Sequence, residues 1–321
     1  MTQSPPTAPA AQPDPGIGLE WPPPPFLSPA PPVVGQDGVR HFDSVTYART
    51  PGYRPRLLDV RVPVSDKPVP AVVWIHGGAW LDGDRRFPPP TVPAELLFGM
   101  ILGAGLAVVT IDYRHSLEAP FPAQLHDTKA AIRHVRRFAA DLGIDTDRIG
   151  VCGESAGGHL AALAGLVRAD GSDAQAALEG GEGVRDEDSS VRAVVAWYAA
   201  TDLGPLLSRA LPPAPPGAEY PDPFTALLGG TPEQLPELAR VASPVTYASQ
   251  AAPPPFLLIH GTADRLLPYS QSEVLAEALH RAGGQVTLQP VESAGHIFLG
   301  APDMTPMVSG SVAFLARHLG V

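Results

Sequence analysis

Five short apolar runs, rich in valine and isoleucine, constrain the fold of this chain more than any other feature. They are residues 71–75, 106–111, 149–152, 193–198 and 255–259. Continuous apolar runs of this length are typical of strands covered on both faces, as in a parallel sheet. Three further segments are expected to be strands, the first two of them antiparallel: residues 45–48, 57–62 and 285–289. The sequence therefore predicts eight strands.

Helical patterns lie between these runs. Residues 122–142 carry apolar side chains on one face, begin at Pro122 and end before Gly143. Residues 270–283 start with a capping-box pattern and end at a glycine, and residues 308–319 form a last amphipathic pattern. Alternation of strands and helices predicts an α/β fold, with a mostly parallel sheet and helices on both faces.

Three segments do not fit this alternation. Residues 1–35 hold 12 of the 40 prolines, so we expect a proline-rich arm or disordered tail that makes neither helix nor ladder, outside an α/β domain at 36–321. Trp21 and Phe26 would attach the end of this arm, if it is not loose. Residues 168–190 are acidic and are expected to be a solvated loop, and residues 202–249 a small lid insertion.

Composition excludes several classes of partner. The net charge is −11, from 33 acidic against 22 basic residues, which argues against nucleic acid and anionic membranes. One cysteine, Cys152, excludes an intramolecular disulfide and a cysteine-based zinc site. We see neither a secretory signal nor a membrane span, so a cytoplasmic location is expected, and a homodimer is kept open.

The segment Gly153-Glu154-Ser155-Ala156-Gly157 lies between an apolar run and a run of alanine and leucine. This order predicts a strand, a tight turn and a helix, with the serine hydroxyl exposed above the sheet. A residue with a Cβ in place of either flanking glycine would collide with a neighbouring strand or helix. The first N–H groups of the helix point at the serine, so Ser155 is a candidate nucleophile.

The partners of this serine are expected at other strand ends, because parallel strands present their carboxyl ends at one edge. We assign His296 as the base and Asp264 as the carboxylate that orients it. For the oxyanion we assign the backbone N–H groups of Gly77, Gly78 and Ala156. No spacing of histidine, cysteine or aspartate indicates a metal, and no cofactor is expected.

The motifs resemble an α/β-hydrolase, and most closely the hormone-sensitive-lipase-like and BD-FAE-type carboxylesterases, over roughly residues 57–320. The segments that carry the resemblance are 76–80, 112–114, 153–161, 260–264 and 295–296. It implies the α/β-hydrolase fold and a serine carboxylesterase that acts through an acyl-enzyme. The short lid favours small, short-acyl esters as substrates. The sequence has His-Gly-Gly-Ala where many relatives have three glycines, so the Ala79 Cβ would narrow the acyl site.

Several alternatives stay open. The same triad could serve an amidase, formamidase or peptidase, or the chain could be a non-catalytic ligand-binding homologue. Asp202, after the fourth apolar run, is the rival of Asp264, although capping the first turn of the lid is its expected role.

Other side chains near strand ends receive secondary roles. Glu154 is expected to orient a neighbouring loop, and Asp112 and Arg114 to form an internal ion pair or brace. Three aromatic residues are expected to line the substrate pocket: Trp80, Trp197 and Tyr198.

Overall fold

The computed structural model describes residues 24–168, 172–207, 221–231, 233–249 and 252–321. Within them, nine strands form one sheet in the order β1-β2-β3-β5-β4-β6-β7-β8-β9. Their bounds are β1 Val33–Val34, β2 Arg40–Ala48, β3 Arg56–Val62, β4 Val69–Ile75, β5 Ala107–Ile111, β6 Ile144–Glu154, β7 Val194–Trp197, β8 Phe256–Gly261 and β9 Val286–Val291. The α/β fold class is confirmed, and eight of these strands coincide with the predicted runs.

The direction of the strands follows their burial. The six strands from β5 to β9 in the sheet order are parallel, whereas β1, β2 and β3 pair antiparallel at one edge. All seven residues of β4 and all five of β5 are buried, as expected for strands covered on both faces. Strand β3 alternates buried and half-buried residues, so only one of its faces is fully covered.

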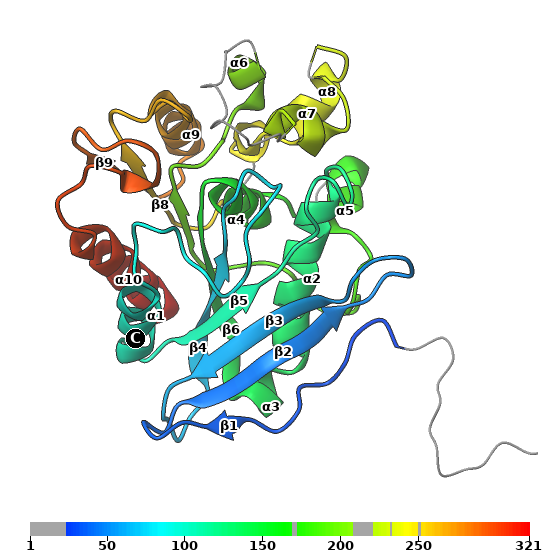
Figure 1. Cartoon of the computed structure of the whole chain (residues 1–321), viewed down its shortest axis with the longest axis vertical. Helices are drawn as coiled ribbons and strands as arrows, with labels where there is room; N and C mark the ends of the chain where they lie inside the picture. The colour runs from blue at the N-terminus through cyan, green and yellow to red at the C-terminus, as the bar shows by residue number, and fades with distance from the viewer. Residues whose placement is uncertain (1–23, 169–171, 208–220, 232, 250–251) are drawn as a thin grey trace, which may run out of the picture.

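Helices cover both faces of the sheet (Figure 1). One apolar core includes residues of α2 (Ala123–Arg137), α3 (Ala139–Leu142), α4 (Ala156–Leu166) and α9 (Ser270–Arg281). A second core, on the other face, includes α1 (Ala94–Gly103) and α10 (Thr305–Leu319). Alternate residues of β4 enter the two cores, Val73 and Ile75 the first and Trp74 the second. Within the described residues, no helix is both long and apolar enough to span a membrane.

The ninth strand, β1, was not predicted. Val33 and Val34 pair with His41 and Arg40 of β2, so the expectation that nothing before residue 36 joins a ladder is wrong. These two valines carry the N–H groups that the prolines around them lack. Phe26 packs edge-on against His134 and Phe138 on α2 and just after it. Trp21 and the rest of residues 1–23 lie outside the described residues.

Residues 168–190 are not a simple solvated loop. They contain a helix, α5 (Asp173–Glu179), and two of their acids form ion pairs with buried basic groups. Glu179 pairs with Lys129 and Arg133 of α2, and Glu182 with Arg56 of β3 at 2.9 Å. These basic groups require counter-charges because burial of an unpaired charge is costly.

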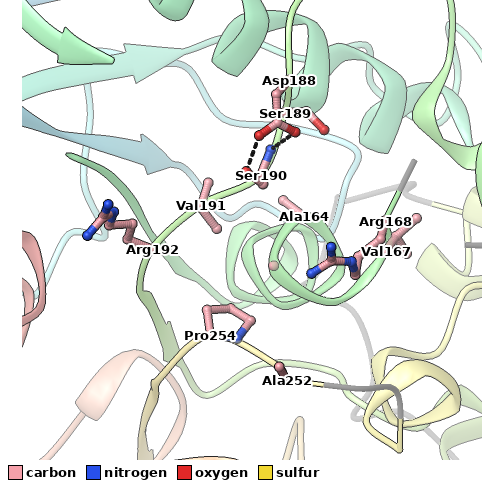
Figure 2. Close-up of a pocket in the computed structure, with 11 residues that line it drawn as sticks. Ala164, Val167, Arg168, Asp188, Ser189, Ser190, Val191, Arg192, Ala252 and Pro254 are labelled. Atoms are coloured by element: carbon pink, nitrogen blue, oxygen red, sulfur yellow. Dashed lines mark hydrogen bonds between the residues drawn. The ribbon is translucent and has the colours of Figure 1, made fainter. Parts of the chain in front are cut away.

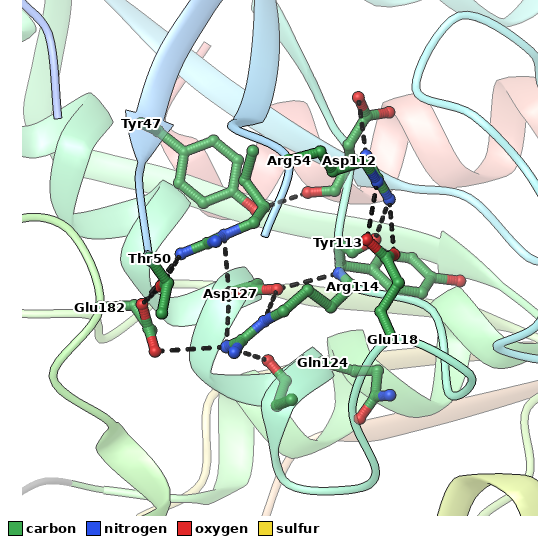
Figure 3. A network of polar contacts seen from close by, with 12 residues as sticks. Tyr47, Thr50, Arg54, Asp112, Tyr113, Arg114, Glu118, Gln124, Asp127 and Glu182 are labelled. Carbon is green, nitrogen blue, oxygen red and sulfur yellow. Dashed lines mark hydrogen bonds and ion pairs between the residues drawn. The ribbon is translucent and has the colours of Figure 1, made fainter. Parts of the chain in front are cut away.

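Figure 3 shows the polar network around Glu182. Arg114 lies 2.8 Å from Asp127, and Asp112 lies 2.9 Å from Arg85. Asp112 and Arg114 therefore both form internal ion pairs, as expected, with Arg85 and Asp127 rather than with each other. The network joins the antiparallel edge of the sheet to α2 and to the segment after α5.

The described parts of residues 202–249 form short helices near the carboxyl ends of the strands (Figure 1). They are α6 (Leu203–Leu207), α7 (Pro223–Leu228), α8 (Pro236–Val241) and the 3₁₀ helix η1 (Pro244–Tyr247). Residues 208–220 of this insertion lie outside the described residues. The insertion contacts α4 through the carbonyl oxygen of Ala242, which lies 2.7 Å from His159 Nε2.

Candidate active site

Ser155 lies in the tight turn between β6 and α4. Its backbone has φ 53° and ψ −116°, a strained conformation for a residue with a side chain. A Cβ added to Gly153 would lie 2.3 Å from the carbonyl oxygen of Gly157, and one added to Gly157 would lie 2.0 Å from that of Ile75. The prediction that both glycines are sterically required is therefore confirmed.

Three side chains from separate loops meet at this turn. Ser155 Oγ lies 3.0 Å from His296 Nε2, and His296 Nδ1 lies 2.7 Å from Asp264 Oδ2. Because a carboxylate can only accept, Nδ1 carries the proton, which leaves Nε2 free to accept from the serine hydroxyl. The structure thus brings together the three residues that the sequence predicted as nucleophile, base and orienting carboxylate.

Further donors hold the Asp264 carboxylate. Its Oδ1 accepts hydrogen bonds from the backbone N–H groups of Leu266 and Leu267, and His260 Nε2 lies 3.3 Å from Oδ2. Burial acts to raise the pKa of this carboxyl, but the hydrogen bonds from His260 and His296 hold the pKa well below its usual range. Asp264 is therefore ionised throughout the neutral pH range.

The rival carboxylate, Asp202, contacts a backbone N–H of the insertion. Asp202 Oδ1 accepts a hydrogen bond from the Gly204 N–H at 3.2 Å, at the start of α6. This contact fits the capping role that the sequence predicts for Asp202. Among the described residues, no group of three or more histidine, cysteine, aspartate or glutamate side chains is arranged to hold a metal ion.

The loop after β4 carries the predicted oxyanion donors, and one of them is already in use. The Gly77 N–H donates to Glu154 Oε1 at 2.7 Å, so this part of the prediction is wrong: the N–H faces a carboxylate. Within the described residues, the N–H groups of Gly78 and Ala79 donate no hydrogen bond. Ala156 is the first residue of α4, where N–H groups lack an intrahelical acceptor.

Side chains around this loop hold it in place. The Tyr113 hydroxyl donates to the carbonyl oxygens of His76 and Gly77, and the His76 ring stacks on Tyr113 with centroids 4.4 Å apart. His76 Nδ1 lies 2.8 Å from the Gly77 carbonyl oxygen. Burial lowers the pKa of His76 to about 4, so the ring is neutral. His76 thus braces the loop.

The three aromatic candidates for the pocket differ in their placement. Trp80 donates from Nε1 to His159 Nδ1 at 3.2 Å and packs against Phe224 of the insertion, so it lies between the turn and α7. Tyr198 packs edge-on against His296, with ring centroids 4.9 Å apart. Both stay candidates for lining the pocket.

The prediction that Trp197 lines the substrate pocket is wrong. Its indole N–H donates to Ser311 of α10, and its ring packs against Trp74 in the core on the α10 face. Because a strand residue points to one face of the sheet only, and Trp197 belongs to the core on the α10 face, its side chain points away from the side occupied by α4. It does not line the site.

A separate cavity of about 500 Å³ lies at the opposite end of the sheet (Figure 2). It is bounded by the last turn of α4 and by residues that directly precede β7 and β8, among them Arg192 and Pro254. Because parallel strands present their catalytic ends at the carboxyl edge, this cavity does not belong to the site around Ser155.

Comparison with known proteins agrees with this geometry. The BD-FAE family model matches residues 58–279, which include Ser155 and Asp264 but not His296. Esterase LipC of Mycobacterium tuberculosis is 33% identical over 288 residues, which cover 88% of this chain and 66% of LipC. The chain thus spans slightly less than two thirds of the length of that relative.

Solved structures extend the similarity over almost the whole chain. A truncated carbohydrate esterase from gut microbiota is 29% identical, with a TM-score of 0.73, and the match covers 91% of this chain and 100% of that one. Esterase 2 of Thermogutta terrifontis with bound propionate is 25% identical, with a TM-score of 0.64 and coverages of 86% and 93%. The latter has also been solved phosphorylated by paraoxon. The chain therefore belongs to the BD-FAE family and has the α/β-hydrolase fold.

Proposed function

We propose that the protein is a serine carboxylesterase that hydrolyses small, short-acyl esters through an acyl-enzyme. The observation that carries this proposal is the unbroken chain of contacts from Ser155 Oγ through His296 to Asp264, at 3.0 and 2.7 Å. A hydroxyl is a weak nucleophile, and a neutral imidazole within hydrogen-bond distance activates it. The esterases that the chain resembles support the same activity.

In the first half of the reaction, Ser155 Oγ attacks the ester carbonyl carbon while His296 Nε2 takes the serine proton. Asp264 stabilises the imidazolium that forms. The carbonyl oxygen gains a negative charge. The N–H groups of Gly78, Ala79 and Ala156 would stabilise this charge by donating hydrogen bonds to the oxygen. Each such donor typically lowers the barrier by ~3 kcal/mol. The tetrahedral intermediate collapses when the C–O bond to the alcohol breaks and His296 protonates the leaving oxygen.

The second half of the reaction repeats these steps with water. His296, neutral again, takes a proton from a water molecule that attacks the acyl carbon of the Ser155 ester. The second tetrahedral intermediate expels Ser155 Oγ, which recovers its proton from His296, and the carboxylic acid leaves. All proton transfers pass through one imidazole, so one base suffices for both halves.

The size of the acyl group is the part of specificity that the site addresses most directly. Ala79 places a methyl group in the loop that would carry the oxyanion donors, and the buried rings of Trp80 and Phe224 lie in contact beside that loop. Esterase 2, which was solved with propionate, supports a short acyl chain. The similarity to a carbohydrate esterase makes acylated sugars a second class of substrate to test.

The experiment that tests this proposal is the loss of esterase activity on replacing the nucleophile. Ser155→Ala should lower kcat on p-nitrophenyl acetate by about 10⁴-fold or more, because the covalent route is lost. Ser309→Ala, whose hydroxyl contacts the Pro306 carbonyl oxygen on α10, is the matched control and should keep full activity. Full activity of Ser155→Ala would refute the assignment.

Two parallel assays separate this function from its alternatives. Paraoxon should phosphorylate the wild-type protein at Ser155, detected by peptide mass spectrometry, but not Ser155→Ala; a ligand-binding homologue would not react. Turnover of short acyl esters should exceed that of N-formyl amides and aminoacyl amides. A preference for amides would favour the formamidase or peptidase alternative.

The cytoplasmic location and the homodimer stay predictions, which cell fractionation and light scattering would test.

A further inference from the structure

Glu154 directly precedes Ser155 and is almost fully buried, with 6% of its surface exposed. Its Oε1 accepts the Gly77 N–H at 2.7 Å. A Cβ built on Gly77 would lie 2.1 Å from Oε1 and 2.7 Å from Oε2, so the carboxylate occupies the space that a side chain at residue 77 would need. Glu154 therefore holds Gly77 in place, and Gly77 directly precedes the remaining oxyanion donors, Gly78 and Ala79.

The same carboxylate also interacts electrostatically with the base. Burial raises the pKa of Glu154, while the charge of His296, the Gly77 N–H and the Tyr198 hydroxyl act to lower it. The Tyr198 hydroxyl and Glu154 Oε2 are both buried, and neither makes a well-aligned hydrogen bond within the described residues. Tyr198 in turn packs edge-on against His296. Glu154, Tyr198 and His296 thus form one contiguous group beside Ser155.

We propose that Glu154 is a positioning residue of this site: it fixes the oxyanion loop against the nucleophile and places a second negative charge near the catalytic base. This inference rests on the proposed esterase function. The contact with Gly77 sets the direction of the next two N–H groups, and oxyanion donors lose much of their effect when they are misplaced. The charge favours the imidazolium that His296 becomes in the transition state.

The other groups around His296 define what a change at Glu154 can do. Asp264 contacts the imidazole directly at 2.7 Å, and His260 lies behind Asp264. Ser155 faces Nε2 and Tyr198 faces the ring. Glu292, on the same loop as His296, is exposed and lies 3.4 Å from the Thr262 hydroxyl. Asp264 is therefore the main charge that acts on the base, and Glu154 is a second, buried one.

Two substitutions separate the clamp from the charge. Glu154→Gln keeps an oxygen that can accept from Gly77 but removes the charge. Because the imidazolium is then less favoured, the acidic limb of kcat/KM should move to lower pH by about one unit. Glu154→Asp keeps the charge but is too short to reach Gly77. Its kcat should fall about 10-fold or more with little change in KM, and its acidic limb should stay in place.

The measurement is the pH profile of p-nitrophenyl acetate hydrolysis, with thermal unfolding of each variant as a check on folding. Glu292→Gln is the matched control, since it removes an exposed glutamate from the His296 loop and should leave the profile unchanged because solvent screens it. Should Glu154→Asp not fold, Gly77→Ala disrupts the same contact from the other side and should likewise lower kcat.

The results distinguish the two levels of the argument. If Glu154→Gln keeps the wild-type acidic limb and Glu154→Asp keeps its kcat within twofold, the positioning role is overturned while the esterase assignment stands. If Ser155→Ala retains activity, the proposed function itself fails, whatever the Glu154 variants do.

Discussion

The direction of individual hydrogen bonds decides what each polar residue of this site can do. His296 must carry its proton on Nδ1, because Asp264 only accepts, and this leaves Nε2 toward Ser155. His159 is fixed in the same way, since Nδ1 accepts from Trp80 and Nε2 must therefore donate to the Ala242 carbonyl oxygen. Burial lowers the pKa of His159 to about 4, so this neutral form persists across the working pH range.

At this scale, the two candidate carboxylates give a sharp test. Asp264→Asn should lower kcat by about 10³- to 10⁴-fold, because an amide can offer an N–H and so favour the wrong tautomer of His296. Asp202→Asn should stay within a few-fold of wild type, since Asp202 contacts only the start of α6. Steady-state kinetics on p-nitrophenyl acetate provide the comparison. A larger loss for Asp202→Asn would move the acid of the triad to residue 202.

The residue assignments that could be made from sequence are those with a local signature. Ser155 lies between glycines at a strand end, and His296 and Asp264 follow strands of their own. The Gly77 N–H was assigned wrongly, because a glycine that donates to the oxyanion and one that donates to Glu154 look the same in the sequence. Trp197 was misplaced because the side to which a strand residue points depends on the register with β6 and β8, which no local pattern gives.

Among the structural elements, the segment after α5 offers the clearest measurement of how buried charge affects stability. Glu182→Ala would leave Arg56, which is fully buried, and Arg114 with one counter-charge fewer. We expect a loss of about 2–4 kcal/mol in the free energy of unfolding. Glu187→Ala removes a more loosely held pair with the exposed Arg137, at 3.9 Å, and should cost at most about 0.5 kcal/mol.

Urea denaturation would measure both variants. The midpoint should fall for Glu182→Ala with an unchanged m-value, which indicates lost stability rather than altered compactness. Equal midpoints for the two variants would mean that Arg56 and Arg114 are satisfied without Glu182.

Elements were predictable where one face of the pattern differed from the other. The helices α2, α9 and α10 have amphipathic sequences, and their existence was predicted. The helix α1 was missed because nine of its ten residues are apolar or glycine, so it has no polar face from which to recognise a period. The single predicted helix at 122–142 is divided at Phe138 into α2 and α3, a break that its apolar spacing did not indicate.

The whole molecule should lose stability as the pH falls below neutral, because several buried histidines are neutral in the fold. Burial lowers the pKa values of His76, His134 and His159 from 6.5 to about 4. Below pH 6.5 the unfolded chain therefore binds protons that the folded chain does not, and unfolding is favoured. The loss should accumulate until about pH 4, at ~1.4 kcal/mol per unit of pKa difference for each group.

Thermal unfolding between pH 7 and pH 4 would measure this effect. His134→Gln removes one of the titrating groups while keeping a donor for the Leu27 carbonyl oxygen, so the unfolding temperature should depend less steeply on pH. A flat dependence for the wild type, or an unchanged slope for His134→Gln, would contradict the account.

The sequence by itself determined the fold class, the strands of the parallel sheet and the three residues that meet at Ser155. These features depend on periodicity, on continuous apolar runs and on the rule that parallel strands end at one edge, all of which are local or topological. Only the tertiary structure decided which N–H groups make no hydrogen bond, on which face of the sheet Trp197 lies and which residues form ion pairs with the buried charged groups. Such choices depend on distances between residues far apart in the chain, where a shift of one ångström separates a free donor from one already bonded.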